Sequence, residues 1–430
     1  MLPKSRRLRR ILLAYTVNEL GTWFGYVALA LGVYDHTHSA IATAGLFVAR
    51  GLLPAFLAPV LVARVERSTR RGRLTSLYLV EAALIAALAA LLWRFWLPGV
   101  LALVTVDGVV AVAATALVRA SAARVMVGEA AEEADPQSGA VVRQSSANAA
   151  QRQASAALNF AFMGSLAVGP ALGGVLVHAV GGPAALLTDA ATFAVCAGLL
   201  LNVGTHVEEA AGDSIRTRLR AAVEHMRAVP ALRVLLLTQA VAIVFFASVE
   251  PVEVLYAKAT LNAGDVGFGL LVAVWGVGAA LGAVVFARSM RRPLGAMLTG
   301  GTLLVGLAYL GFAAAPTLAL ACGAAVIGGV GNGIQWPSLL SAVQQLTPAA
   351  LHGRLMSAVG SLNALCPAIG FALGGTIAAL SSPRGAMVVA GAVATVATLA
   401  FMRLPLRGLQ SADDGQVAVT AEPSLATPTQ

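Results

Sequence analysis

The sequence predicts an all-α membrane protein with twelve transmembrane helices, arranged as two homologous six-helix bundles. Its composition, its apolar stretches and an internal repeat support this fold. Hydrophobic residues make up 58% and charged residues 11% of the 430-residue chain, and the mean hydropathy is +0.81. Soluble domains carry about 25% charged residues, so a soluble core of this length is excluded. A lone segment in lipid must satisfy its own backbone hydrogen bonds, so each apolar stretch is predicted to be helical.

The apolar stretches divide evenly between the two halves of the chain, and each has about the 20 residues that span a hydrocarbon core. They cover residues 11–33, 41–63, 74–93, 98–118, 155–178 and 184–203, and then 234–256, 267–287, 294–313, 317–343, 355–380 and 385–403. Asn18 and Glu19 interrupt the first stretch, and no small-residue cleavage site follows it. We therefore predict a retained helix rather than a signal peptide. A long loop is expected at about 119–152.

The two halves repeat each other. Residues 45–67 share ten ungapped identities with residues 269–291, and Pro170-Ala171-Leu172-Gly173 matches Pro367-Ala368-Ile369-Gly370. We predict a bundle at 1–203, a cytoplasmic linker at 204–233, a second bundle at 234–407 and a disordered cytoplasmic tail at 408–430. The linker fits an amphipathic surface helix and a solvated connector equally well.

The positions of the basic residues predict the orientation. With the N-terminus inside, every Lys and Arg lies in a cytoplasmic segment except Arg94, Lys258 and Arg384 outside and Arg50 within a helix, in accord with the positive-inside rule. Both termini are then cytoplasmic, and the expected location is the inner (plasma) membrane. The net charge of +9 is spread over many loops, which argues against a nucleic-acid partner.

No enzyme or cofactor signature is present in the sequence. A phosphate-binding loop requires a Gly-Lys pair followed by Ser or Thr, but the two lysines, Lys4 and Lys258, follow Pro and Ala. Cys196, Cys322 and Cys366 fall within predicted helices, where they act as small apolar residues rather than disulfide or metal ligands. We expect no catalytic residue, no metal and no cofactor, and no oligomer is required.

Ionisable side chains within a bilayer are expensive and are candidate functional groups. Glu19 lies about 12 Å into its helix and Arg50 about 15 Å into the next, at 1.5 Å per residue, so their depths nearly coincide. An ion pair between them would be either structural or a protonation switch, and both interpretations stay open. Asp107, near the middle of its helix, is the second candidate proton carrier.

Four further acids are interpreted more cautiously. Glu81 and Asp189 lie nearer the membrane faces, which favours helix-packing roles. Glu250 and Glu253 flank Pro251 near the outer end of their helix. They fit an external gate or a site that attracts cations, but a solvated helix end is the preferred interpretation.

A polar group in the 317–343 helix is the candidate substrate cavity. Asn332, Gln335 and Trp336 precede Pro337 and follow a run of glycines at 328–333. A Gly-rich, Pro-interrupted helix is typical of a transporter cavity wall. For the glycines themselves, close helix packing is the favoured interpretation.

Short motifs resemble the major facilitator superfamily, whose two halves move about a central site. Gly169-Pro170-Ala171-Leu172-Gly173-Gly174 matches the core of the fifth-helix motif of its antiporters and exporters, although the further Gly of that motif is replaced by Ser165. The sequences Asn18-Glu19-Leu20-Gly21-Thr22-Trp23 and Gly353-Arg354-Leu355-Met356-Ser357 resemble the branch of drug, macrolide and siderophore exporters.

The superfamily's motif between the second and third helices is incomplete here. Ala63 stands where that motif has the Asp that helps to lock the cytoplasmic gate, with Glu66 nearby as a possible substitute. The resemblance implies gate candidates at Arg64, Glu66, Arg67 and Arg354.

These features predict a secondary active transporter, with proton-coupled efflux of an amphipathic or hydrophobic small molecule as the preferred function. Its partners would be the substrate, protons and the bilayer. An importer of a polar nutrient, as symporter or uniporter, is the alternative. That function usually requires several buried basic groups, and Arg50 is the only one predicted. A membrane sensor or membrane enzyme is a third class, for which the sequence shows no buried catalytic cluster.

Overall fold

The computed structural model describes residues 6–66, 72–133, 140–201, 224, 227–289, 292–348, 351–402 and 406–407, and within them the regular secondary structure is entirely helical. The first half contains α1 (Arg6–Thr37), α2 (Ala40–Glu66), α3 (Arg73–Trp93), α4 (Leu97–Glu133), α5 (Ala140–Val180) and α6 (Gly182–Leu199). The second half contains α8 (Pro230–Ala247), α9 (Glu250–Leu255), the π-helix η1 (Tyr256–Thr260), α10 (Gly264–Arg288), α11 (Leu294–Ala314), α12 (Leu318–Gln345), α13 (His352–Leu380) and α14 (Pro383–Phe401).

The predicted twelve-span architecture is confirmed. Segments α8, α9 and η1 follow one another as a single interrupted span, so each half contributes six. Among the described residues, ten helices are long and apolar enough to cross a membrane by themselves. Helix α1 is less apolar because it carries Asn18 and Glu19. In α2 the side chains are described without a gap only over Ala40–Leu52, and this part is apolar. The protein is therefore a multi-pass membrane protein. The linker and tail predictions fall largely outside the described residues.

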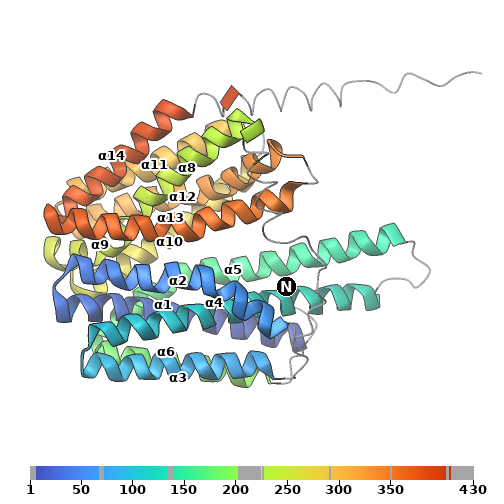
Figure 1. Ribbon diagram of the computed structural model, residues 1–430, viewed down its shortest axis with the longest axis horizontal. Coiled ribbons are helices and arrows are strands. Elements are labelled where there is room, and N and C mark those ends of the chain that lie inside the picture. The colour runs from blue at the N-terminus through green and yellow to red at the C-terminus, as the bar shows by residue number, and fades with distance from the viewer. Residues whose placement is uncertain are drawn as a thin grey trace, which may run out of the picture.

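The two halves lie side by side with their long helices roughly parallel (Figure 1). Helix α1 begins at the end that we call the near end, and α2 begins at the opposite, far end. Between the halves, α5 packs along α10 and α2 packs along α13. These two pairs form the seam on which the halves meet.

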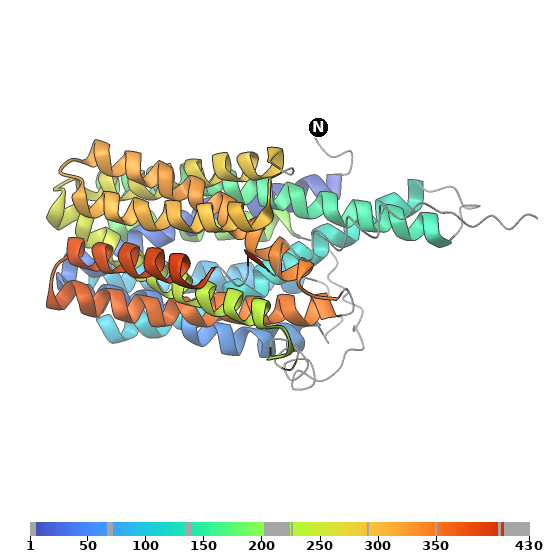
Figure 2. The ribbon, with the colours of Figure 1, turned by 90° about the horizontal axis from the view of Figure 1, so that it is seen from above.

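The predicted loop at 119–152 is wrong. Helix α4 continues to Glu133 and α5 begins at Ala140, and both project past the other helices at the near end (Figures 1 and 2). At 1.5 Å per residue they are about 55 and 62 Å long, roughly twice the thickness of a hydrocarbon core. Their polar ends are rich in Ala, Arg, Glu and Gln, which favour helix in water as well as in lipid.

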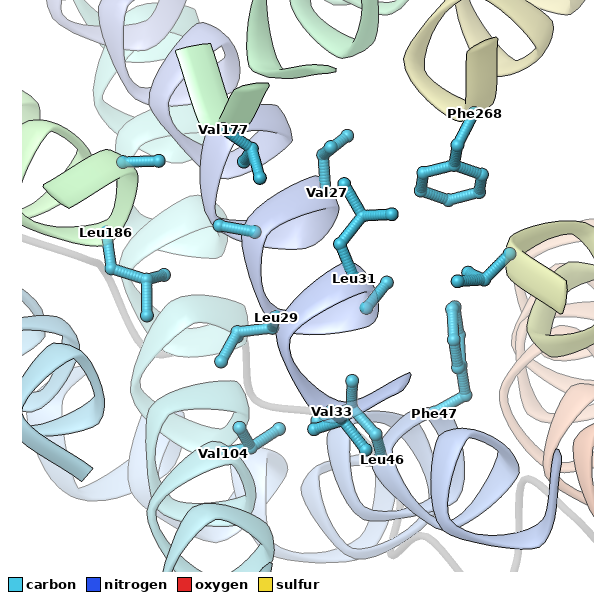
Figure 3. Close-up of a cluster of buried hydrophobic side chains, with 14 of the residues drawn as sticks. Val27, Leu29, Leu31, Val33, Leu46, Phe47, Val104, Val177, Leu186 and Phe268 are labelled. Carbon is cyan, nitrogen blue, oxygen red and sulfur yellow. The ribbon is translucent and has the colours of Figure 1, made fainter. Parts of the chain in front are cut away.

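Apolar packing joins the halves toward the far end. Val27 and Leu31 of α1 are fully buried, and Phe47 of α2 and Phe268 of α10 lie in the same cluster (Figure 3). Tyr26 of α1 stacks on Phe268 with ring centroids 6.4 Å apart. The first helix of the first half therefore contacts the second half directly.

Glycines at repeated positions face the first helix of each half, with a closer approach in the second half. A Cβ added to Gly173 of α5 would lie 3.3 Å from the Trp23 carbonyl oxygen of α1, and one added to Gly370 of α13 would collide with the Val244 carbonyl oxygen of α8. Each glycine thus lets its helix approach the first helix of its own half, as small residues do in membrane bundles.

Candidate functional site

A cavity of about 320 Å³ lies between the halves, with most of its wall from the second half. Helices α8 to α13 supply most of the lining, and Trp23 and Tyr26 of α1 and Leu166 of α5 supply the rest. A larger groove of about 770 Å³ between α8 and α14 is lined almost entirely by apolar side chains. Because specific recognition needs placed polar groups, the central cavity is the candidate site.

Polar side chains of α12 line this cavity. Asn332, Gln335 and Trp336, the three residues proposed from the sequence, all lie on its wall. Gln335 Nε2 donates a 2.8 Å hydrogen bond to Gln239 Oε1 of α8, and Gln239 Nε2 lies 3.4 Å from Thr302 Oγ1 of α11. This chain of hydrogen bonds fixes three helices around the cavity.

Glu250 and Glu253 also line the cavity, which overturns the preferred interpretation of a solvated helix end. Helix α8 ends at Ala247, and the chain restarts as α9 at Glu250 with Pro251 next to it. Pro cannot donate a backbone hydrogen bond, so the span is interrupted at this point. Among the described residues neither carboxylate has a hydrogen-bond or ion-pair partner. Pro251 between two acids was the available sequence signal.

Aromatic rings form much of the remaining wall. Tyr309 of α11 stacks on Trp275 of α10 with centroids 5.5 Å apart and contacts Phe246 of α8 at 5.7 Å. On the α1 side, Trp23 meets Tyr26 edge to face at 5.4 Å. These pairs give the cavity an amphipathic surface of ring faces, amides and carboxylates.

Glu19 does not pair with Arg50, so this part of the prediction is wrong. Its carboxylate accepts a hydrogen bond from the Tyr15 hydroxyl one turn earlier, and the nearby cation is Arg119 of α4. Arg119 Nη2 in turn donates a 2.7 Å bond to the Tyr15 hydroxyl oxygen. Equal depth in two helices does not make their side chains face each other, and Glu19 points toward α4.

Arg50 instead borders a small separate cavity with Tyr26, Leu29, Leu46 and Phe47. Tyr26 also lines the main cavity, so the two cavities share this residue. The acids that Arg50 influences electrostatically belong to the first half: Glu81, Asp107 and Asp189.

Asp107 lies in a buried acidic group. Glu81 of α3, Asp107 of α4 and Asp189 of α6 are each at most 4% exposed and influence one another electrostatically. In the described part of the chain, Glu81 Oε2 and Asp107 Oδ1 have no hydrogen-bond partner. Sequence depth placed Glu81 and Asp189 nearer the membrane faces, but the fold buries both. The described residues contain no group of three acids, His or Cys placed to hold a metal.

The fifth-helix motif packs against two different neighbours. An added Cβ at Gly169 would collide with Trp23 of α1, within the same half, and one at Gly173 would be in tight contact with α1 at 3.3 Å. One added at Gly174 would lie 3.2 Å from Gly269 Cα of α10, across the seam. Pro170 lies within α5, and its carbonyl oxygen contacts the same Gly269. The motif therefore sets the spacing of the two halves toward the far end.

A charge cluster joins the halves at the far end. Lys258 Nζ of η1 donates to Asp35 Oδ1 of α1 at 2.5 Å and to Asp265 Oδ1 of α10 at 2.8 Å. We call Asp35, Lys258 and Asp265 the far-end latch. At the near end, the gate candidates cannot be placed: Arg67 and the side chains of Arg64, Glu66 and Arg354 lie outside the described residues.

The family of this chain follows from a match over nearly its whole length. A family model described as "Transmembrane secretion effector", from the major facilitator group, matches residues 3–430. The chain belongs to this transporter family. No curated protein sequence matches it. The drug, macrolide and siderophore exporter branch suggested by its motifs stays a prediction.

Solved transporters share the fold at low sequence identity. The nucleoside transporter NupG superposes with a TM-score of 0.70 at 11% identity, covering 93% of this chain and 98% of its own. The peptide-family transporter PepTSo gives 0.67 at 12% identity over 95% and 99%. A bacterial homologue of the human lysosomal transporter Spinster gives 0.65 at 14% over 95% and 99%. At these identities the likeness establishes the architecture of this membrane transporter.

Proposed function

We propose that this protein is a proton-coupled exporter of an amphipathic or hydrophobic small molecule. The observation that carries the proposal is the cavity between the halves, whose wall combines Trp275, Tyr309 and Gln335 with two carboxylates. A site at the interface of two repeats suits alternating access, in which the repeats rock about the bound substrate. The family description, secretion effector, favours the outward direction.

In this proposal the contacts at the far end break and re-form during the transport cycle. The latch and the Gly174–Gly269 contact both join the halves at the far end. Breaking them would open the cavity toward the outside. By the positive-inside rule the near end, with both termini, faces the cytoplasm of a cell whose plasma membrane holds the protein.

For the coupling ion we propose the proton. Asp107 is buried, and among the described residues its Oδ1 has no hydrogen-bond partner. Glu19 interacts with the Tyr15 hydroxyl and with the charge of the exposed Arg119. A buried charged carboxylate needs a nearby cation or hydrogen-bond donor, and the protonated form does not. Binding or release of a proton can therefore favour one of two arrangements of the surrounding helices. Glu81 and Asp189 adjoin Asp107 and extend the candidate path.

For the glycine motif we propose an antiporter role, with Gly173→Leu more harmful to export than Gly370→Leu. Both glycines face the first helix of their own half, but a Cβ at Gly370 would collide with the Val244 carbonyl oxygen, whereas one at Gly173 would lie 3.3 Å from its nearest neighbour. Packing alone therefore predicts that Gly370→Leu is the more harmful change, and the antiporter role predicts the reverse. If both changes are equally harmful and Gly173→Ala remains fully active, the motif serves packing alone.

A substrate screen in inside-out vesicles with an imposed pH gradient tests the proposal. We expect uphill uptake of amphipathic compounds into vesicles made acidic inside, and none when the gradient is collapsed. Movement of polar nutrients only out of these vesicles, which corresponds to import into the cell, would establish the importer instead. Uptake driven by a sodium gradient but not by a pH gradient would remove the proton from the mechanism.

A further inference from the structure

We propose that the central cavity is a binding site for a monovalent organic cation, held by Glu250 and Glu253 against an aromatic wall. This inference rests on the proposed function and narrows its substrate class. Three properties of the cavity carry it: unbalanced negative charge, an unusual density of aromatic rings, and a volume suited to an organic molecule.

The first property is charge. Glu250 and Glu253 lie on one short helix, and among the described residues that line the cavity there is no Lys, Arg or His. Lys258, five residues farther on, is already bound to Asp35 and Asp265. Arg50 borders the separate small cavity and does not line this one. Unpaired carboxylates within a membrane protein are costly. In this proposal a bound monovalent cation balances one carboxylate, and a proton on the other leaves the site neutral.

The second property is the aromatic wall. Six of the nineteen residues that line the cavity are aromatic, whereas aromatic residues make up 6% of the chain. The six are Trp23, Tyr26, Phe246, Trp275, Tyr309 and Trp336. Ring faces attract cations, most strongly where water is excluded, and recognise quaternary ammonium groups in this way. They also accept the apolar part of an amphipathic ligand.

The third property is size. A volume of about 320 Å³ is about that of ten waters in the liquid, at roughly 30 Å³ each. It lies at the lower end of the range for small-molecule pockets, roughly 300–1,000 Å³. A bare metal ion would leave most of it unused, and the described residues contain no group of three or more His, Cys, Asp or Glu placed to hold one. An ammonium group with one ring fits both the volume and the lining.

The test compares two probes of the same shape. Phenyltrimethylammonium carries a positive charge, and tert-butylbenzene is its neutral counterpart with carbon in place of nitrogen. Binding to the purified full-length protein in detergent is measured by titration calorimetry, without any transport step. We expect the cation to bind at least about tenfold more tightly than the neutral probe. Glu250→Gln and Glu253→Gln should each weaken cation binding by about tenfold or more, and the double change should abolish the preference.

Controls separate this effect from unfolding and from net charge. The variants should retain the affinity of the wild type for tert-butylbenzene, which shows that the cavity is intact. Glu129→Gln, on the near-end projection of α4, removes one negative charge far from the cavity and should leave cation binding unchanged. Trp275→Leu should weaken the cation more than the neutral probe.

Two results would overturn the proposal: equal affinities of the two probes for the wild type, or cation binding that survives the double Gln change. The outcome is independent of the proposed direction of transport. Cation binding without export would support the cation site and contradict the proposed exporter function. Export of other compounds without cation binding would support the exporter and contradict the cation site.

Discussion

Gly269 offers the sharpest test of the seam, because backbone atoms occupy the space where its side chain would be. A Cβ at this position would collide with the Pro170 carbonyl oxygen and lie 3.0 Å from Gly174 Cα. Carbon atoms in ordinary contact are about 3.5–4.0 Å apart, so α5 and α10 must separate by at least about 0.5 Å. Overpacking of this kind costs about 1–3 kcal/mol.

In the rocking-halves account, this cost is confined to the state in which the far end is closed. Gly269→Ala should therefore lower the ratio of closed to open molecules by about 5- to 150-fold. Spin labels at Arg94 and Ser381, exposed positions of different halves at the far end, report the change by double electron–electron resonance. The labels require a background free of the native cysteines Cys196, Cys322 and Cys366.

The expected result is a shift of the distance distribution toward longer values in Gly269→Ala. Gly164→Ala is the matched control on α5, since a Cβ there would meet nothing within 4 Å, and its distribution should equal that of the wild type. An unchanged distribution in a folded Gly269→Ala protein would refute the rocking of the halves on this seam.

Two further predictions concern charges. Asp35→Asn breaks the part of the far-end latch that joins the halves and should also lengthen the labelled distance. The effect should be at most about fivefold because the Asp35 side chain is 42% exposed. Asp265→Asn, within the half that holds the latch lysine, should change the distance little, and an equal effect of both would contradict the latch. Tyr15→Phe should lower the free energy of unfolding by about 1–3 kcal/mol, because it removes a hydrogen bond to buried Glu19. Tyr34→Phe is its control in detergent melts, and equal melting of the two variants would argue against the bond.

The sequence predicted the spans well wherever hydropathy changes sharply at their ends. The predicted stretches at 74–93 and 294–313 differ from α3 and α11 by a residue. It failed for the near-end projection of α4 and α5, because a polar helix in water leaves no hydropathy signal. The residue types there favour helix, but the contrast with the apolar spans suggested a loop.

The sequence predicted how deep the candidate side chains lie in the membrane, but not which neighbouring helix they face. Asn332 and Gln335, which the sequence marks as a polar segment of one helix, line the central cavity, and their role in substrate binding stays a prediction. Glu19 was assigned the wrong partner because the rise per residue gives the height of a side chain and not the side of the helix that bears it. Glu250 and Glu253 were assigned to solvent because they lie near the predicted end of a span, and the sequence does not show that the segment after the interruption at 248–249 lines the cavity.

Uphill transport by Asp107→Asn tests the central claim, that a buried acid of the first half couples proton movement to movement of the substrate in the cavity. In proteoliposomes, a substrate from the vesicle screen is followed both against its gradient, driven by a pH gradient, and in exchange with itself without one. An amide keeps the shape of the side chain but cannot cycle a proton. The account predicts that Asp107→Asn, alone or with Glu19→Gln, loses uphill transport and keeps self-exchange. Uphill transport at the wild-type rate in both variants would contradict it.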